Sequence, residues 1–159
     1  MAKSGIYAFG VTYQTKVVYV YQDKIGHVEK GKISIWIRLS IFRVAEFMDK
    51  ALEILKQYYG YSSFREGQEE IIREILNGND VLTIMPTGGG KSICYQVPAI
   101  LLDGITIVIS PLISLMKDQV DSLVTMGINA CYINSSLSSE DYNNILQGII
   151  NDEYKIIYV

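Results

Sequence analysis

The sequence predicts an α/β fold, with a parallel sheet and flanking helices preceded by a short β-rich segment. Three observations carry this prediction. After Met48, short apolar runs without alternation are separated by stretches of helical periodicity, the pattern of a parallel sheet covered on both faces. One of these runs leads into a glycine-rich loop and then a helix. Before Met48 the apolar residues follow period two instead.

Charge places the domain boundary at the same point. Residues 1–47 contain seven Lys and Arg against three Asp and Glu, a balance of +4, whereas residues 48–159 have a balance of −7. We therefore divide the chain into a β-rich N-terminal extension, 1–47, and a main domain, 48–159. Because the main domain is acidic, bulk attraction cannot hold it to nucleic acid, and any such contact must be local.

The extension reads as three short strands. Val17–Tyr21 and Ile33–Ile41 are rich in β-branched and aromatic residues, and a turn region from Gly26 to Gly31 separates them. No chemical motif occurs here. The extension is either a small β-module for binding or an appended leader. We favour the leader, because MDKALEILKQYYGY, beginning at Met48, resembles a natural protein start.

Helical periodicity begins at Met48. Ala51, Leu52 and Leu55 share one face of a first helix, which Gly60 ends. The capping-box spacing Ser63-x-x-Glu66 predicts the start of a second helix, which Gly78 ends. The remaining predicted elements are a strand at 81–85, a helix at 91–102 kinked by Pro98, a strand at 105–110, a helix at 112–126, a strand at 130–133, a helix at 139–151 and a strand at 155–159.

The stretch MPTGGGKS, residues 85–92, has the chemistry of a phosphate-binding loop. Gly88, Gly89 and Gly90 can adopt backbone angles that turn successive N–H groups into one concavity, and the following helix adds its positive dipole end. Lys91 is expected to reach the β- and γ-phosphates, and the Ser92 hydroxyl to ligate Mg²⁺. The pattern G-x-x-x-x-G-K-[ST] wants glycine where Met85 stands. Met85 ends the strand, so its side chain need not enter the loop. A flexible turn is the alternative, which the strand and helix disfavour.

Upstream, YGYSSFREGQ contains Tyr61, Arg65 and Gln68, spaced so that they can share one side of a turn. A glutamine amide offers a donor and an acceptor, which suits the N6 and N7 edge of adenine. A tyrosine ring or an arginine plane can stack on a base. Without further context, these residues read equally as surface polar side chains around a core Phe64.

Composition excludes several classes of protein. No apolar run approaches the roughly 18 residues of a membrane span, and the N-terminus lacks the features of a secretory signal. Cys94, Cys131 and His27 are too far apart in sequence to build a metal site or a disulfide framework, so we expect buried free thiols. A cytoplasmic protein without membrane association is the resulting expectation.

Four stretches, in this order and spacing, strongly resemble the N-terminal part of RecQ-family DNA helicases, which belong to superfamily 2. They are YGYSSFREGQEEII, MPTGGGKSICYQVPA, VISPLISLMKDQVDSL and INSSLSS. The resemblance covers residues 48–159 and implies a partial RecA-like domain with a P-loop. The family's phosphate loop often carries methionine where Met85 stands. Residues 1–47 have no part in the resemblance.

The resemblance implies roles for these residues. Tyr61, Arg65 and Gln68 would hold adenine, and Thr87 to Ser92, including Lys91 as the catalytic lysine, would hold the triphosphate of ATP and Mg²⁺. Ser110, Lys117, Asn134 and Ser135 would contact single-stranded DNA, and duplex junctions would be family substrates. Loops after strands gather around ligands, and hydroxyl groups suit phosphate contacts. Lys117 reads equally as a helix-surface lysine paired with an acid.

The family also uses parts that these residues do not supply. After a strand like 155–159 it has an Asp-Glu-x-His box, and a second RecA-like domain later supplies an arginine to the γ-phosphate. The sequence therefore predicts the nucleotide-binding part of an ATP-dependent 3′–5′ DNA helicase of repair and recombination, without hydrolysis or unwinding of its own. The alternative is a stand-alone nucleotide- or DNA-binding module. The sequence leaves the oligomeric state open.

Overall fold

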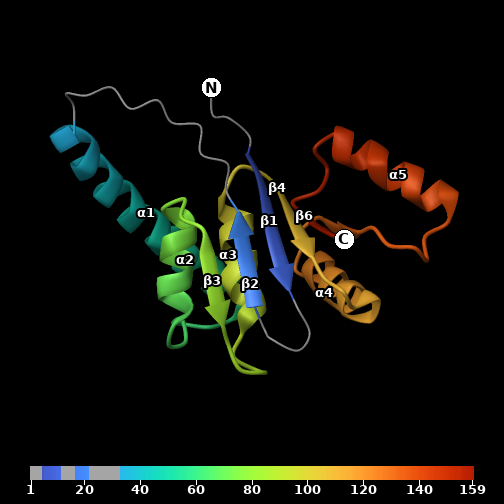
Figure 1. Ribbon diagram of the computed structural model, residues 1–159, viewed down its shortest axis with the longest axis horizontal. Helices are drawn as coiled ribbons and strands as arrows, with labels where there is room; N and C mark the ends of the chain where they lie inside the picture. The colour runs from blue at the N-terminus through green and yellow to red at the C-terminus, as the bar shows by residue number, and fades with distance from the viewer. Residues whose placement is uncertain (1–4, 12–16, 22–32) are drawn as a thin grey trace.

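The computed structural model describes residues 5–11, 17–21 and 33–159. These ranges form an α/β fold, as predicted, in which a six-stranded sheet has the order β3-β2-β1-β4-β6-β5 (Figure 1). The strands are β1 (Gly5–Val11), β2 (Val17–Tyr21), β3 (Val81–Ile84), β4 (Gly104–Ile109), β5 (Ala130–Tyr132) and β6 (Ile156–Tyr158). The helices are α1 (Ile33–Tyr59), α2 (Gln68–Leu76), α3 (Lys91–Leu101), α4 (Ile113–Thr125) and α5 (Ser139–Ile150).

The predicted parallel sheet is present in β4, β6 and β5, which pair in parallel. β1 extends this parallel set because it pairs with β4 from Gly5 to Gly10. β2 runs antiparallel to both of its neighbours, β1 and β3. β3 therefore points the same way as β4, and the loops that follow β3, β4 and β5 leave the sheet at one edge.

The N-terminal extension differs from its prediction in one element. The strand at Val17–Tyr21 is confirmed as β2, but the strand predicted at Ile33–Ile41 is wrong, because these residues form the first turns of α1. A short apolar run does not distinguish a strand from a helix by periodicity. Here the run joins the helix that includes Ala51 and Leu55, and extending a helix is easier than nucleating one. The turn predicted at residues 26–31 lies outside the described residues.

The second helix also begins later than predicted. α2 starts at Gln68, and its N-cap is Gly67, with a φ of 79° and no capping side chain. Ser63 therefore does not cap this helix. Instead, the side chain of the first helical residue, Gln68, bonds back to the segment before the helix. Its Oε1 accepts a hydrogen bond from the backbone N–H of Arg65 at 2.8 Å. The other predicted elements after residue 80 match the structure to within one or two residues.

Two buried clusters hold the fold together. The first lies between the sheet and helices α2, α3 and α4 and includes Met85, Cys94, Val108, Leu123 and Tyr158. The second joins α1 to α2 and α3, and at its centre Leu55 is fully buried. The opposite face of β3 is open, because Leu82 and Ile84 are 64% and 76% exposed. Coverage of both faces, as predicted, therefore does not extend to β3.

The cysteine prediction is confirmed for both residues. Cys94 and Cys131 are buried free thiols, and burial raises the pKa of each to about 12, so both stay protonated at neutral pH. Among the residues that the structure describes, no group of three or more His, Cys, Asp or Glu side chains could hold a metal ion. His27 lies outside the described residues. The described helices include none long and apolar enough to cross a membrane.

Candidate nucleotide-binding site

The glycine loop joins the end of β3 to the start of α3, as predicted. Gly88 and Gly90 have φ values of 79° and 77°, in the left-handed region that glycine adopts without strain. Gly90 is the N-cap of α3, and no side chain caps this helix end. Its first backbone N–H groups and the positive end of its dipole therefore face the loop. This arrangement suits a bound anion.

The loop is packed tightly enough that side chains would not fit at its centre. A Cβ atom on Gly90 would lie 2.3 Å from Nε2 of Gln68, and one on Gly89 would lie 3.0 Å from the carbonyl oxygen of Pro86. The Pro86 carbonyl also accepts a hydrogen bond from the Gly89 N–H at 3.1 Å. Close approach and a positive φ therefore favour glycine at 90, and the contact with Pro86 leaves little room for a side chain at 89. The donor set of backbone N–H groups, a lysine and a serine hydroxyl fits a Mg²⁺-bound triphosphate.

Lys91 and Ser92 form the first turn of α3. The Lys91 Nζ donates to the Pro86 carbonyl at 3.0 Å, so the side chain crosses the loop. This places the ammonium group over the concavity that a phosphate would enter. Both residues are only partly buried. A lysine held in this way can exchange a neutral carbonyl partner for a charged phosphate oxygen, which is the stronger acceptor.

Met85 does not enter the loop, as the sequence predicts. Its side chain is 7% exposed and belongs to the core between the sheet and the helices. Its Sδ lies 3.7 Å from Sγ of Cys94, on the first turns of α3. The departure from the sequence pattern at this position therefore leaves the loop's backbone chemistry unaffected.

Tyr61, Arg65 and Gln68 come together beside the loop. The Arg65 guanidinium lies 5.8 Å from the centroid of the Tyr61 ring, within cation–π range. Arg65 Nη1 also donates to the Gly88 carbonyl at 2.8 Å. An open cavity of about 370 Å³ adjoins this group and is lined by Phe64, Arg65, Glu66, Gly67, Glu69, Glu70 and Arg73.

Gln68 contacts the loop directly, which the sequence did not predict. Its Nε2 donates to the carbonyls of Gly89 at 3.3 Å and Gly90 at 3.1 Å, while its Oε1 accepts from Arg65. The side chain is 1% exposed. Its amide is therefore fully engaged with backbone groups. The run of three glycines was the sequence signal for this contact, because a buried side chain such as that of Gln68 can pack closely against a loop backbone only where the loop has no side chains of its own.

The residues expected to contact DNA lie after β4 and β5, at the same edge of the sheet. Ser110 is 8% exposed, and its Oγ accepts from the Leu112 N–H at 3.4 Å. Asn134 Oδ1 accepts from both the N–H and the hydroxyl of Ser136, whereas its Nδ2 is buried and has no hydrogen-bond partner among the described residues. Ser135 is exposed.

Lys117 is on the second turn of α4 and is exposed. No acidic side chain in the described part of the chain lies within ion-pair distance of it. The alternative prediction, a surface lysine paired with an acid, is therefore not what the described residues form.

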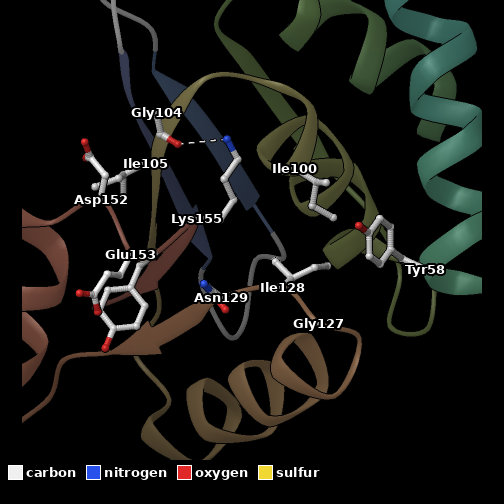
Figure 2. Close-up of a pocket in the computed structure, with 11 residues that line it drawn as sticks. Tyr58, Ile100, Gly104, Ile105, Gly127, Ile128, Asn129, Asp152, Glu153 and Lys155 are labelled. Atoms are coloured by element: carbon white, nitrogen blue, oxygen red, sulfur yellow. Dashed lines mark hydrogen bonds between the residues drawn. The ribbon is translucent and has the colours of Figure 1, made fainter.

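A second cavity in the described part of the chain is not part of this site. Its volume is about 520 Å³, and Figure 2 shows it at the start of β4, with Gly104, Asp152, Glu153 and Lys155 along its wall. The Lys155 Nζ donates to the carbonyls of Leu102 and Gly104, and burial lowers the pKa of this lysine. Asp152 and Glu153 therefore lie at the opposite end of the parallel strands from the glycine loop, as the sequence predicts.

A family model for "DEAD/DEAH box helicase" matches residues 65–159. The chain belongs to the DEAD/DEAH box helicase family. The match begins at Arg65 and includes the whole of the glycine loop and the segments after β4 and β5. Residues 1–47 lie outside it. The α/β architecture is accordingly that of a partial RecA-like helicase domain.

Among individual proteins, the chain is similar to RecQ helicases. It is 54% identical over 109 residues to the "ATP-dependent DNA helicase RecQ" of Haemophilus influenzae and 52% identical over 113 residues to that of Bacillus subtilis. These matches cover 69% and 70% of this chain but only 18% and 19% of the relatives. An "ATP-dependent DNA helicase Q-like 2" of Arabidopsis thaliana is 42% identical over 72% of this chain and 16% of its own length.

The predicted resemblance to the RecQ family is thus confirmed, and DEAD/DEAH box helicases are ATP-dependent enzymes. The chain spans less than a fifth of the length of these relatives. The matched segment of this chain is the one that contains the glycine loop.

Proposed function

We propose that residues 48–159 bind Mg·ATP and single-stranded DNA as part of an ATP-dependent 3′–5′ DNA helicase of repair and recombination. The observation that carries this proposal is the glycine loop between β3 and α3, with Lys91 across it and Arg65 and Gln68 bonded to its backbone. The names of the relatives, which are ATP-dependent DNA helicases, supply the nucleotide and the nucleic acid.

In this proposal each group of the site has one task. The backbone N–H groups of Gly88–Gly90 and the Lys91 ammonium bind the β- and γ-phosphates, and Thr87 completes the loop. The Ser92 hydroxyl is a ligand for Mg²⁺, which neutralises phosphate charge when bound. Tyr61, Arg65 and Gln68 hold adenine, for which the Gln68 amide would exchange its bonds to the backbone of Arg65, Gly89 and Gly90 for bonds to the base. Residues 1–47 are an extension outside the family segment, and the protein is cytoplasmic with no membrane association.

The DNA part of the proposal depends on the loops after β4 and β5. Ser110, Lys117, Asn134 and Ser135 contact the phosphates and sugars of a single strand, which positions the strand without reading its sequence. Asn134 supports this role because it begins the turn after β5, where its Oδ1 accepts from the N–H and the hydroxyl of the exposed residue Ser136. Duplex junctions are the wider substrate, by the family resemblance. The alternative function is a binding module without motor activity.

ATP should bind more tightly than GTP, and Gln68→Ala should bring the ratio of the two dissociation constants close to one. A site that hydrogen-bonds one base edge rejects another base because its own polar atoms are then unpaired. Since Gln68 also holds the carbonyls of Gly89 and Gly90, the variant should lose some affinity for GTP as well, but it should lose more for ATP. Competition titrations measure the ratio, and the exposed residue Gln57, changed to alanine, is the control. A GTP-to-ATP ratio that Gln68→Ala leaves unchanged would remove the adenine role.

The 159-residue chain should release no phosphate from ATP above background, with or without single-stranded DNA. Hydrolysis needs a group that orients water and a charge that stabilises the γ-phosphate in the transition state. Asp152 and Glu153 are at the far end of the sheet and cannot serve. A longer polypeptide with the family's later motifs should turn over ATP. Phosphate release is the measurement; DNA-stimulated turnover by the 159 residues contradicts the prediction.

A further inference from the structure

The strand that leads into the glycine loop is joined to the sheet by residues from outside the family segment. Of the strands that the structure describes, β3 pairs with β2 alone, and β2 reaches β4 only through β1 (Figure 1). The family model begins at Arg65, so it includes β3, β4, β5 and β6 but neither β1 nor β2. The N-terminal extension therefore connects two strands of the family segment.

The pairing made by the extension is more extensive than the pairing within the family segment. β1 pairs with β4 over six residues, 5–10, and β2 pairs with β3 over four, 17–20. β4 and β5 each pair with β6 over only three residues. Each position of a ladder satisfies backbone N–H and C=O groups that need a partner. Much of the backbone bonding of the sheet thus depends on residues 5–21.

Without the extension, β3 and β4 would present two open strand edges to one another. The two strands point the same way, and β1 and β2 fill the space between them. Adjacent strands lie about 4.8 Å apart, so β3 and β4 are separated by about 14 Å in the sheet order β3-β2-β1-β4. An open edge is a row of unpaired donors and acceptors to which an extended segment can add. The space between β3 and β4 therefore has the properties of an acceptor site for strands.

The extension has a composition that suits such a site. The sequences of β1 and β2, GIYAFGV and VVYVY, contain no charged residue and are rich in β-branched and aromatic residues. The charge balance is +4 over residues 1–47 and −7 over residues 48–159, so the extension and the main domain attract each other. Met85 directly follows β3 and begins the glycine loop, so the pairing of β3 also fixes one end of that loop.

We propose that residues 5–21 are a separable strand insert, which occupies an acceptor site for extended strands between β3 and β4. A protein that has β3 and β4 but lacks this insert must satisfy the same backbone groups with a strand from another part of its chain. The matches cover only 18% and 19% of the relatives, so their other residues can supply such a strand. In a longer polypeptide the insert and that strand compete for one site. This competition involves neither nucleotide nor DNA, so it is independent of the proposed function.

A disulfide tests where the insert lies. Tyr19 and Leu82 are paired in register, and the Cα atoms of such a pair are about 4.5–5.5 Å apart, within disulfide range. The double variant Tyr19→Cys, Leu82→Cys should therefore form a disulfide under mild oxidation, which mass spectrometry of its peptides detects. The matched control is Tyr19→Cys, Ile84→Cys, because Ile84 is also exposed but lies two residues out of register. Equal disulfide formation in both variants, or none in either, would overturn the placement of the insert.

Hydrogen exchange in the unmodified chain and in Tyr19→Pro tests whether the insert holds β3 and can be replaced. Proline removes a ladder donor from the middle of β2, so the backbone amides of β3 should exchange about tenfold faster or more. Exchange in β6, which pairs with β4 and β5, should stay the same. A peptide of residues 5–21, added in excess to Tyr19→Pro, should restore the protection of β3. A peptide of the same composition in scrambled order is the control and should have no effect.

Unchanged exchange in β3 of Tyr19→Pro would overturn the proposal, because the insert would then not hold that strand. Faster exchange in β3 that the peptide does not reverse would also overturn it, because residues 5–21 would then be an integral part of the fold and not an insert at an acceptor site. If Tyr19→Pro unfolds the whole chain, β3 and β6 both exchange rapidly. The milder substitution Tyr19→Gly then decides, since glycine weakens a strand without removing its donor.

Discussion

Lys91→Ala should lower the affinity of the chain for Mg·ATP by about tenfold or more. Hydrogen bonds to charged groups contribute about 1.5–3 kcal/mol each, and the Lys91 ammonium is placed across the loop that the phosphates would enter. The effect should fall mainly on binding, because Lys91 is only partly buried and its side chain donates to an exposed loop carbonyl, that of Pro86. Calorimetric titration with Mg·ATP gives both affinities directly.

The matched control for this substitution is Lys56→Ala. Lys56 is an exposed lysine in the last turn of α1, so its removal changes the net charge by the same amount without touching the loop. Affinity should be unaffected by it. Equal affinities in Lys91→Ala and the unmodified chain would reject the glycine loop as a phosphate site.

Gly90→Ala should both destabilise the fold and abolish nucleotide binding. Two costs add at this position. The φ of 77° is a left-handed conformation, which costs an L-residue about 1–2 kcal/mol. The new Cβ would also lie 2.3 Å from Gln68 Nε2, so the amide must move and give up its bonds to Gly89 and Gly90. Chemical denaturation measures the first effect and nucleotide titration the second.

Gly127→Ala separates the two costs. Gly127 follows α4 with a φ of 82°, and a Cβ atom there would meet nothing within 4 Å. This control should lose stability for the backbone reason alone and should bind nucleotide normally. If Gly90→Ala and Gly127→Ala lose the same stability and both still bind Mg·ATP, then the contact between Gln68 and the loop has no role in the site.

The order of elements after residue 80 could be predicted because strong local signals mark their ends. Gly127, which follows α4, and Gly90, which precedes α3, both have left-handed backbone angles. Glycines in the sequence therefore mark the ends of these helices. The unalternated apolar runs between these points are bounded closely by glycine or proline, and their short length favours buried strands over helices. Glycine positions and hydrophobic periodicity together were therefore enough to predict most of the helices and strands of the main domain.

The two misassignments arose where local signals conflict with their surroundings. Ile33–Ile41 alternates like a strand, but it continues into the helix that contains Leu55, and tertiary packing of that helix outweighs the local pattern. Ser63 has the spacing of a cap, yet Gly67 turns the chain before α2 can start. Spacing alone does not reveal the backbone angle of an intervening glycine.

For the site, the position of the glycine loop between β3 and α3 could be predicted from the sequence, but the contacts that support the loop could not. The loop's chemistry is local, in eight consecutive residues, and so is readable from the chain. The contacts of Gln68 with Gly90 and of Gln96 with Tyr158 join residues 22 and 62 positions apart. No periodicity within one element encodes such pairs, because they depend on how α2, α3 and β6 pack. Support of this kind becomes visible only in three dimensions.

The sulfur contact under the loop has a consequence for how this position varies in evolution. Met85 fills core volume against Cys94, so its side chain is constrained by its neighbour in α3 and does not face the loop. Related chains should therefore change positions 85 and 94 together, with small residues at one matched by larger ones at the other, so that the total volume is preserved. Searches that require glycine at the first position of the phosphate-loop motif will miss every chain that has a larger core residue, such as methionine, at this position.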